Sequence, residues 1–506
     1  RRGIKKGIKK KKIIEISNRA IAISEAIKNL NTGNILLVAG KGHEKTQDIK
    51  NKKIYFSDKK IILNAIKIKN SNLSDNLKIN IIKEVSQVKK VSPLFTIKQA
   101  RINSKEVTKN DIFFAIKGKK NDGNKFVSQS FKRKASLAIV NKIQNNFKNR
   151  QIKVENTLKF LTEVSKIYRE NIDTKIVAIT GSCGKTSLKE LLGKVLSKIS
   201  KVSISPKSYN NKYGVPLSLI NLRQNDKYGI LEVGMDKKGE IDYLSKIIQP
   251  NVGVITNINY AHVKNFKNIK QIALAKSEII NNIRPNGFVI LNADDNFFSL
   301  HKKIALKKNL KVISFGIKSK KANIKMFDIK SSGKAFKIQI KINDKKKYFL
   351  ISDDFQNNIY NILSTLAVIS IYKNVYKLNK NIFLDLKIPS GRGDHLKIKI
   401  KNKKINLIDQ SYNSNPLSLK SAINNYDKVD SKKSYKYLLL GDMLELGIHS
   451  EKLHQSIAPL INQTKIDKVF VKGKMATVIF NNISNKKKGR ILVNKSQILE
   501  FIRNDL

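Results

Sequence analysis

The segment 180–187, with the sequence TGSCGKTS, constrains the fold of this chain more than any other stretch. It follows the apolar run 176–179, which predicts a buried parallel strand, and it precedes a helical pattern over 188–199. A strand that leads through a glycine turn into a helix directs several backbone N–H groups at one point, where an anion can bind. Lys185 is then expected to contact the β- and γ-phosphates of a nucleotide, and Thr186 to bind Mg²⁺. The chain is therefore predicted to bind ATP or GTP.

The glycine spacing is the shorter form of this loop, because Ile179 stands where the commonest spacing has its first glycine. A glycine turn that merely joins strand to helix is the alternative, and the Lys-Thr pair at the helix start disfavours it. The residues expected around the phosphates are Gly181, Ser182, Cys183, Gly184, Lys185, Thr186 and Ser187.

The charge balance raises the question of a nucleic-acid partner, since 101 Lys and Arg against 38 Asp and Glu give a formal charge of +63. The lysines are spread along the chain between Asn and Ile, without Trp, zinc-finger spacing or an aromatic-rich basic module. A general compositional bias therefore explains the charge better than a dedicated nucleic-acid site, although a positive field would help to capture a polyanionic small substrate.

The same sequence contains no apolar run of the roughly 20 residues that a membrane-spanning helix needs. Its single cysteine, Cys183, excludes an intrachain disulfide and fits a reducing compartment. We expect a soluble, cytoplasmic, monomeric protein with no nucleic-acid partner.

At 506 residues the chain is long enough for about three or four domains. The first block, 1–70, contains a helical pattern over 20–30, a strand over 35–39 and a glycine loop over 40–44. The polar stretch 70–76 is interpreted as a linker or the start of a new unit.

Three further blocks follow, at 74–170, 171–390 and 391–506, and each mixes strands with helices. The second has strand-like runs and a closing helix, the third alternates apolar strands with helical patterns, and the last repeats that alternation on a smaller scale. The expected strands are 111–116 and 135–140 in the second block, 176–179, 229–233, 252–256, 288–291 and 311–315 in the third, and 405–408, 437–440 and 468–471 in the last; the closing helix of the second is 157–169. The fold class is thus α/β, with a doubly wound parallel sheet in the third block.

Polar residues follow several of these strands, where a parallel sheet presents them to one crevice. Glu232, one strand from the phosphate loop, is well placed to hold Mg²⁺ or its water, although a solvated strand-end glutamate is the default for such a residue. His262 follows the next strand, and a lone His is more often structural than a ligand. Lys276 lies in the helical stretch 273–278, where a surface lysine would be the ordinary interpretation.

Taken together, these strings closely resemble those of the Mur ligases, the ATP-dependent amide-forming enzymes of peptidoglycan precursor synthesis. The resemblance covers about residues 74–506 and is strongest to the branch that adds D-alanyl-D-alanine to UDP-N-acetylmuramoyl-tripeptide. The strings that carry it are TGSCGKTS, Asn211-x-x-Gly214-Val215-Pro216-Leu217, Glu232-Val233-Gly234, Ile255-Thr256-Asn257-Ile258 with Ala261-His262, Ala275-Lys276-Ser277-Glu278, Leu291-Asn292-Ala293-Asp294-Asp295, Gly391-Arg392, Asp409-Gln410-Ser411-Tyr412-Asn413-Ser414-Asn415-Pro416 and Gly441-Asp442-Met443-Leu444-Glu445-Leu446-Gly447.

The resemblance implies a three-domain enzyme with a central ATPase domain and a smaller C-terminal α/β domain. It uses ATP and Mg²⁺ to form an acyl phosphate from the tripeptide carboxylate, which the amine of the dipeptide then attacks. The implied catalytic residues are Lys185, Glu232, His262, Lys276 and Arg392; the metal partners Thr186, Glu232, His262 and Lys276, the last as a carbamate; the nucleotide contacts Asn292, Asp295, Arg392, Asp409, Tyr412 and Asn413; and the substrate contacts Ser104, Lys105, Asn211 and Asn415.

The sequence departs from the family pattern in the uridine-side block. Lys105 stands where Arg is usual, and Asn124 stands for a His. Because Lys lacks the bidentate fork of Arg, these departures concern the affinity for the uridine diphosphate. Asn357 also stands for a His, and Gln410 for a second Asp.

Residues 1–70 resemble a different member of the family. The string 40–44, GKGHE, is similar to the C-terminal end of the ligase that adds the preceding diamino acid, in which the counterparts of Gly40 and Glu44 contact that amino acid. This resemblance implies a fusion of two consecutive enzymes, of which the chain, starting at Arg1 as a truncated or processed product, keeps an α/β remnant of the first. We expect no activity from that remnant, and we expect its deletion to leave the second activity nearly unchanged.

Three alternatives stay open beside the ligase. One is a different Mur-type or folate-adding ligase, the second is a basic nucleic-acid-binding P-loop ATPase, and the third is a degenerate module that binds the precursor without chemistry. The presence of Lys185, Glu232, His262 and Lys276 disfavours the third.

Overall fold

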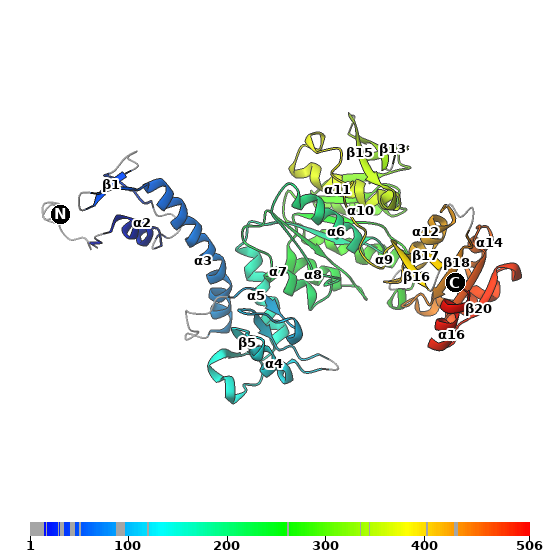
Figure 1. Ribbon diagram of the computed structural model, residues 1–506, viewed down its shortest axis with the longest axis horizontal. Coiled ribbons are helices and arrows are strands. Elements are labelled where there is room, and N and C mark those ends of the chain that lie inside the picture. The colour runs from blue at the N-terminus through cyan, green and yellow to red at the C-terminus, as the bar shows by residue number, and fades with distance from the viewer. Residues whose placement is uncertain are drawn as a thin grey trace. The chain divides into compact units, whose positions relative to one another are not determined.

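The computed structural model describes residues 15–505 except 17, 29, 31–34, 41–45, 50–51, 88–96, 119–120, 261–262, 334, 344, 401–402 and 430–433. The chain divides into two compact units, Arg1–Thr157 and Leu158–Leu506, and each is described by itself (Figure 1). The predicted boundaries near 70, 170 and 390 stay predictions.

The first part of unit 1 packs the helix α2 (Arg19–Lys28) against the start of the long helix α3 (Asp58–Ser86), beside a hairpin of β1 (Thr46–Ile49) and β2 (Lys52–Tyr55). Ile23 and Ile27 of α2 form a small apolar cluster with Ala65 of α3. The helix expected over 20–30 is thus confirmed.

The strand expected over 35–39 is wrong. Leu36 and Val38 pack on the α2–α3 cluster, whereas Ile35 and Leu37 are exposed, so the segment has the alternation of a strand but pairs with no strand among the described residues. Of the glycine loop expected over 40–44, the structure describes Gly40, and residues 41–44 lie outside the described residues.

The expectation of a linker over 70–76 is also wrong, since the stretch lies inside α3. It contains neither Gly nor Pro, the two residue types that most strongly end a helix. The real ends carry the usual caps: the Ser57 side chain accepts from the Lys60 N–H at the start, and Gln87 has the left-handed conformation, with φ +54°, at the end.

The second part of unit 1 is a parallel sheet in the order β3-β4-β5-β6. Its apolar core includes Phe113, Val127, Ala138 and Val140, and it confirms the strands expected over 111–116 and 135–140. The elements are β3 (Ala100–Arg101), the 3-10 helix η1 (Ser104–Glu106), β4 (Ile112–Phe114), α4 (Val127–Lys132), β5 (Leu137–Val140), β6 (Gln151–Lys153) and α5 (Thr157–Glu170), which confirms the helix expected over 157–169 and continues into unit 2.

Unit 2 is built around a large sheet in the order β15-β14-β13-β12-β11-β10-β7-β9-β8. The strands from β8 to β13 are parallel, and β13, β14 and β15 form an antiparallel extension that the sequence analysis did not anticipate. All five runs expected as strands are confirmed. The strands are β7 (Lys175–Thr180), β8 (Val202–Ile204), β9 (Tyr228–Glu232), β10 (Val252–Ile255), β11 (Phe288–Asn292), β12 (Lys311–Gly316), β13 (Ile324–Ser332), β14 (Ala335–Ile342) and β15 (Lys345–Ser352).

Helices cover both faces of this sheet because the chain changes direction across it. From β7 the chain runs outward to β8, and from β9 it returns past β7 to β10, β11 and β12, so right-handed crossovers place the helices on opposite faces. One face buries α6 and α11 in the main apolar core (Figure 1). The helices are α6 (Lys185–Ser197), α7 (Gly214–Ile220), α8 (Glu240–Ile248), α9 (Ile269–Ser277), α10 (Phe298–Lys307) and α11 (Ile359–Tyr372).

The last part of unit 2 has a parallel sheet in the order β18-β19-β20 and a separate antiparallel hairpin of β16 and β17. The strands expected over 437–440 and 468–471 lie in the parallel sheet as predicted. The run 405–408 is a strand but pairs in the hairpin instead. The elements are β16 (Asp394–Ile400), β17 (Lys403–Asp409), α12 (Pro416–Asp427), β18 (Tyr437–Gly441), α13 (Ser450–Gln455), α14 (Ala458–Asn462), β19 (Lys468–Lys472), α15 (Lys474–Asn482), β20 (Lys488–Ile491) and α16 (Lys495–Glu500).

In the part of the chain that the structure describes, no helix combines the length and the apolar character that crossing a bilayer would require.

Candidate active site

The phosphate loop lies between the end of β7 and the start of α6, at the point where the strand order of the large sheet reverses. The helix begins at Lys185, so the N–H groups of its first turn, from Lys185 through Thr186 to Ser187, have no partner within the helix. In open α/β sheets this switch point at the carboxyl ends of the strands is where ligands bind. The structure thus places the loop where the sequence predicted it.

Gly181 is required by the close approach of a neighbouring strand end. Its φ is +142°, and a Cβ there would lie 1.9 Å from Thr256 Oγ1. Gly184, with φ +81°, turns the chain into α6. Both conformations favour glycine, and at Gly181 any side chain would displace the loop after β10.

That loop after β10 braces the phosphate loop. Asn257 accepts a hydrogen bond from the Ser182 N–H with its backbone carbonyl (2.9 Å) and from the Cys183 N–H with its side-chain oxygen (3.0 Å). Thr256 Oγ1 donates to the Cys183 carbonyl at 2.5 Å. Because the N–H groups of Ser182 and Cys183 have these partners, the N–H groups that follow in the loop and in α6 are the ones positioned for an anion.

The Lys185 ammonium folds back over the loop and donates to the Gly181 carbonyl at 2.9 Å. Burial lowers the pKa of Lys185, and the carboxylate of Glu232 and the other negative charges nearby act in the opposite direction. The positive charge of Arg392 also lowers this pKa, so Arg392 lies within electrostatic range of Lys185.

Thr186 and Glu232 form a buried polar pair beside the loop. Thr186 Oγ1 donates to Glu232 Oε2 at 2.7 Å, and Asn210 Nδ2 donates to Glu232 Oε1 at 2.8 Å. Glu232 ends β9, the direct neighbour of β7, and is 2% exposed. A hydroxyl and a carboxylate are oxygen donors of the kind that Mg²⁺ prefers, so this pair fits the ion chemically.

Lys276 is in the last turn of α9 and is 1% exposed. Burial lowers its pKa well below the ordinary value for a lysine, and the positive charge of Lys185 lowers it further. The two amines are therefore near each other, and Lys276 is held in a site that disfavours its charged form. The interpretation of Lys276 as an ordinary surface lysine is wrong.

His262, which the sequence placed with these residues, lies outside the described residues. Among the residues that the structure does describe, no three His, Cys, Asp or Glu side chains gather as a metal site.

The residues expected near the adenosine brace the site from the β11 side. Asn292 Nδ2 donates to the Thr256 carbonyl at 3.3 Å, and Asp295 Oδ2 accepts from the Ile258 N–H at 2.7 Å. Both bonds fix the loop that in turn holds the phosphate loop. Although burial acts in the opposite direction, three successive backbone N–H groups of residues 317–319 lower the pKa of the neighbouring Asp294.

A second brace comes from the segment after the central sheet. The Arg392 guanidinium lies over the Tyr412 ring, with its central carbon 4.2 Å from the ring centroid. The Tyr412 hydroxyl is 2.6 Å from Ser208 Oγ, in the loop that follows β8. Tyr412 thus connects Arg392 to the central sheet.

Asn415, at the start of α12, makes a second contact with the central sheet. Its side chain caps the helix by accepting from the Ser418 N–H at 3.0 Å. The Asn415 amide also contacts Cys183 Sγ, with Nδ2 at 2.9 Å and Oδ1 at 3.1 Å. Asn415 therefore reaches the phosphate loop itself.

Other predicted residues have local partners. The side chains of Asp409 and Asn413 accept from the backbone N–H groups of Ser411 and Ser414, each at 2.9 Å, so these side-chain bonds are local. Asn211 Oδ1 accepts from the Gly214 N–H at 3.0 Å and caps the start of α7. These residues lie in the same unit as the phosphate loop, and the side-chain hydrogen bonds described for them go to other residues.

Ser104 and Lys105 lie in unit 1, on η1. Ser104 is buried, and its hydroxyl donates to Gln129 Oε1 at 2.7 Å, whereas the Lys105 side chain is exposed. Asn124, which stands in the place of the expected His, is buried and donates to Asp122 at 2.6 Å.

Sequence reasoning missed two asparagines at the site. Asn210 holds the free oxygen of Glu232, and it directly precedes Asn211, the residue that the sequence analysis chose. Asn361 of α11 approaches the phosphate loop so closely that a Cβ at Gly184 would lie 3.3 Å from its Oδ1. The adjacent pair Asn210-Asn211 was visible in the sequence and could have indicated Asn210. No motif in the sequence around Asn361 indicates that residue.

Comparison with known proteins finds relatives of this chain. Residues 179–369 match the family model of the Mur ligase middle domain. A UDP-N-acetylmuramoyl-tripeptide–D-alanyl-D-alanine ligase from Buchnera aphidicola subsp. Acyrthosiphon pisum is 36% identical over 422 residues, which cover 81% of this chain and 87% of that protein.

Solved structures resemble the chain over a similar extent. A crystal structure of MurF from Acinetobacter baumannii matches with a TM-score of 0.72 and 26% identity, covering 84% of this chain and 91% of that one. A structure of MurF from Thermotoga maritima in complex with ADP matches with a TM-score of 0.67 and 24% identity, covering 80% and 90%, and at that identity it supports the fold alone.

Proposed function

The chain belongs to the Mur ligase family, and we propose that it is an ATP-dependent ligase that adds D-alanyl-D-alanine to UDP-N-acetylmuramoyl-tripeptide. The observation that carries the proposal is the group of Lys185, Thr186 and Glu232 at the switch point of the sheet, next to the start of α6. A cation, a hydroxyl–carboxylate pair and free helix N–H groups are the parts that binding and transfer of a γ-phosphate require.

In the proposed reaction, a carboxylate oxygen of the tripeptide attacks the γ-phosphorus and ADP leaves. The amine of D-alanyl-D-alanine then attacks the acyl carbon, an amide bond forms, and phosphate leaves with the former carboxylate oxygen. Lys185 and Arg392 are the cations that would balance charge on the transferred phosphoryl group and on the tetrahedral state. Asp409, Tyr412 and Asn413 are proposed to contact the nucleotide.

Thr186 and Glu232 are the residues that would hold Mg²⁺, with His262 as a further ligand. When bound, the ion would neutralise negative charge on the β- and γ-phosphates. The contribution of this chain is to hold the two oxygens in place, with Asn210 fixing the Glu232 carboxylate from the other side.

We propose that Lys276 acts as a carbamate. Its burial and the nearby charge of Lys185 favour the neutral amine, and a neutral amine is the form that attacks CO₂, giving a carbamate and releasing one proton. The resulting anion would offset the positive charge of Lys185.

Replacing Lys276 with Ala tests this role. The variant should lose activity and regain part of it with added short carboxylates, and the intact protein should show the mass of one bound CO₂. Full activity of Lys276→Ala without any additive would contradict the assignment.

We propose that Ser104 and Lys105 contact the uridine side of the substrate and that Asn211 and Asn415 contact the peptide side.

ATP turnover tests the proposed function as a whole. We expect ADP formation beyond one equivalent per enzyme only when the UDP-tripeptide and D-alanyl-D-alanine are both present, and no stimulation by DNA or RNA. Turnover that responds to nucleic acid and ignores the two substrates would favour the nucleic-acid-dependent ATPase instead.

A further inference from the structure

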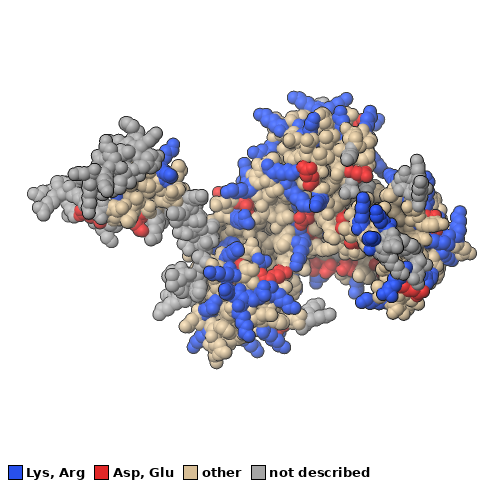
Figure 2. Space-filling view, in the orientation of Figure 1, with Lys and Arg blue, Asp and Glu red and all other residues tan. Residues whose placement is uncertain are grey.

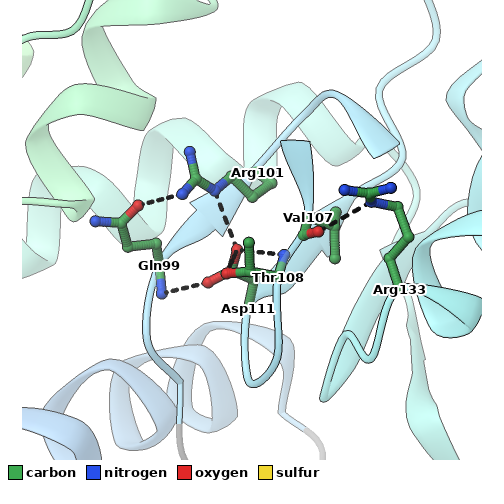
Figure 3. Close-up of polar contacts among 6 residues, drawn as sticks. All are labelled: Gln99, Arg101, Val107, Thr108, Asp111 and Arg133. Carbon is green, nitrogen blue, oxygen red and sulfur yellow. Dashed lines mark hydrogen bonds and ion pairs between the residues drawn. The ribbon is translucent and has the colours of Figure 1, made fainter. Parts of the chain in front are cut away.

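A single carboxylate, that of Asp111, holds both ends of the exposed loop that carries Ser104 and Lys105 (Figure 3). The loop leaves the sheet after β3 and returns just before β4. Asp111 directly precedes β4, and its backbone carbonyl accepts from the Ser136 N–H at 2.8 Å. The backbone that carries the carboxylate is therefore held by the sheet rather than by the loop.

On the β3 side of the loop, Asp111 Oδ1 accepts from the N–H of Gln99, which directly precedes β3, at 3.2 Å, and Oδ2 accepts from Nε of Arg101, the last residue of β3, at 3.1 Å. At the end of the loop, Oδ2 accepts from the Thr108 N–H at 2.9 Å and from Thr108 Oγ1 at 3.0 Å. The same two oxygens therefore join residues on either side of the loop.

The burial of this carboxylate makes these bonds hard to replace. The Asp111 side chain has no exposed surface, whereas the Arg101 side chain that pairs with it is 27% exposed. A buried charge is tolerated only where it is paired and hydrogen-bonded, and removing one partner leaves the others unsatisfied.

Inside the loop, further bonds fix the backbone while Lys105 stays exposed. Asn103 Oδ1 accepts from the Lys105 N–H at 3.0 Å, and Ser104 is tied to Gln129. Arg133 Nε donates to the Val107 carbonyl at 3.1 Å (Figure 3). The result is an exposed cation on a loop with few ways to move.

We propose that Asp111 is a positioning residue for substrate binding. By fixing both ends of the loop, it determines where Lys105 meets the diphosphate of a uridine-diphosphate-linked substrate. This inference rests on the proposed function, and it assigns to a buried structural carboxylate a part in substrate affinity. A lysine makes one point contact rather than the fork of an arginine, so its affinity depends more on where the loop holds it.

The test compares KM values in the full chain. Asp111→Asn keeps the shape but loses the charge and places an N–H₂ group against donors, so KM for UDP-N-acetylmuramoyl-tripeptide should rise about tenfold or more. KM for ATP, KM for D-alanyl-D-alanine and kcat should stay within about twofold, because those steps do not use the loop. Thr108→Val removes one of the four hydrogen bonds to the Asp111 carboxylate and should raise KM for the UDP-tripeptide about threefold. If Asp111→Asn does not fold, this variant tests the inference in its place.

The matched control is Ile152→Ala. Ile152 is 3% exposed on β6 of the same sheet, so the variant destabilises the unit without touching the loop, and it should leave KM for the UDP-tripeptide unchanged. The inference is wrong if Asp111→Asn or Thr108→Val folds with that KM unchanged, if all three KM values rise together, or if Ile152→Ala raises it equally.

Calorimetric binding of the UDP-tripeptide separates this inference from the proposed function. If the wild-type chain binds it but forms no amide, the proposed function fails while weaker binding by Asp111→Asn still supports the inference. If the wild-type chain neither binds nor ligates, both are overturned.

Discussion

Both oxygens of the Glu232 carboxylate have protein partners, Thr186 on one side and Asn210 on the other. A metal ion at this place would therefore have to share or replace the Thr186 hydrogen bond, while the Asn210 bond could remain. At the scale of single residues, the site is a set of side chains already held by one another. That arrangement limits the reorganisation needed when a nucleotide arrives.

Replacing Lys185 with Ala should lower kcat about 10²-fold or more, because the transferred phosphoryl group loses its nearest cation. The fold should remain, since the one hydrogen bond described for the Lys185 side chain goes to the Gly181 carbonyl. Steady-state turnover at saturating ATP, with circular dichroism as the folding check, measures both.

Lys194→Ala is the control for this variant, because Lys194 lies on the same helix and its ammonium contacts the Lys387 carbonyl at an exposed place. It should retain the wild-type rate. Wild-type turnover by Lys185→Ala would show that the loop has another function.

At the scale of elements, the sequence predicted the parts that repeat simple patterns. Apolar runs identified β7, β9, β10, β11 and β12 because a sheet covered on both faces needs continuous apolar strands. The glycine turn and Lys-Thr pair located the phosphate loop for a similar local reason.

The sequence could not predict contacts that depend on pairing between distant segments. The segment 35–39 has the composition of a strand and yet pairs with no other strand in the part of the chain that the structure describes, and the run 405–408 pairs with β16 rather than with the parallel sheet. Asn361 reaches the phosphate loop only because α6 and α11 pack on the same face. Register and packing, not local propensity, decide such cases.

The contact between α9 and α10 leads to a prediction about how the free energy of unfolding depends on pH. His301 of α10 is 2% exposed, and its Nε2 lies 3.0 Å from the Ala273 carbonyl of α9, the helix that carries Lys276. Burial lowers the pKa of His301, although the hydrogen bond to Ala273 acts the other way. The folded state thus binds a proton less readily than the unfolded state, whose histidine titrates near 6.5.

The free energy of unfolding should therefore fall as the pH drops below about 6.5, and this loss should continue down to the lowered pKa of the folded state. Urea unfolding at pH 7.5 and 5.5 measures it. His301→Leu should show a smaller loss than the wild type. Equal losses in the two proteins would contradict the role given to burial.

At the scale of the whole molecule, the charge of +63 is distributed rather than concentrated. Figure 2 shows Lys and Arg side chains over the visible face of each unit, with Asp and Glu between them. This distribution suits long-range attraction of small polyanions such as ATP or a UDP-linked peptide more than a continuous track for nucleic acid.

Removing residues 1–56 should leave kcat/KM for ligation within about twofold of the full chain, because the resemblance to the D-alanyl-D-alanine-adding ligases begins only at about residue 74. The cut keeps Ser57 as the cap of α3, whereas a cut at residue 70 would fall inside that helix. Ile61 and Ala65 lose the cover of α2, so solubility is the property expected to change. Loss of ligation by a truncated chain that still folds would make the first segment a working part of the enzyme.

Amide formation through an acyl phosphate moves one oxygen atom from the tripeptide carboxylate to inorganic phosphate, and an isotope label can follow that atom. The purified chain is given ATP, Mg²⁺, D-alanyl-D-alanine and UDP-N-acetylmuramoyl-tripeptide labelled with ¹⁸O in its terminal carboxylate, and the products are examined by mass spectrometry. This mechanism predicts the UDP-linked pentapeptide, ADP, and inorganic phosphate that carries one ¹⁸O from the carboxylate. ATP hydrolysis without pentapeptide, or pentapeptide with unlabelled phosphate, would contradict it.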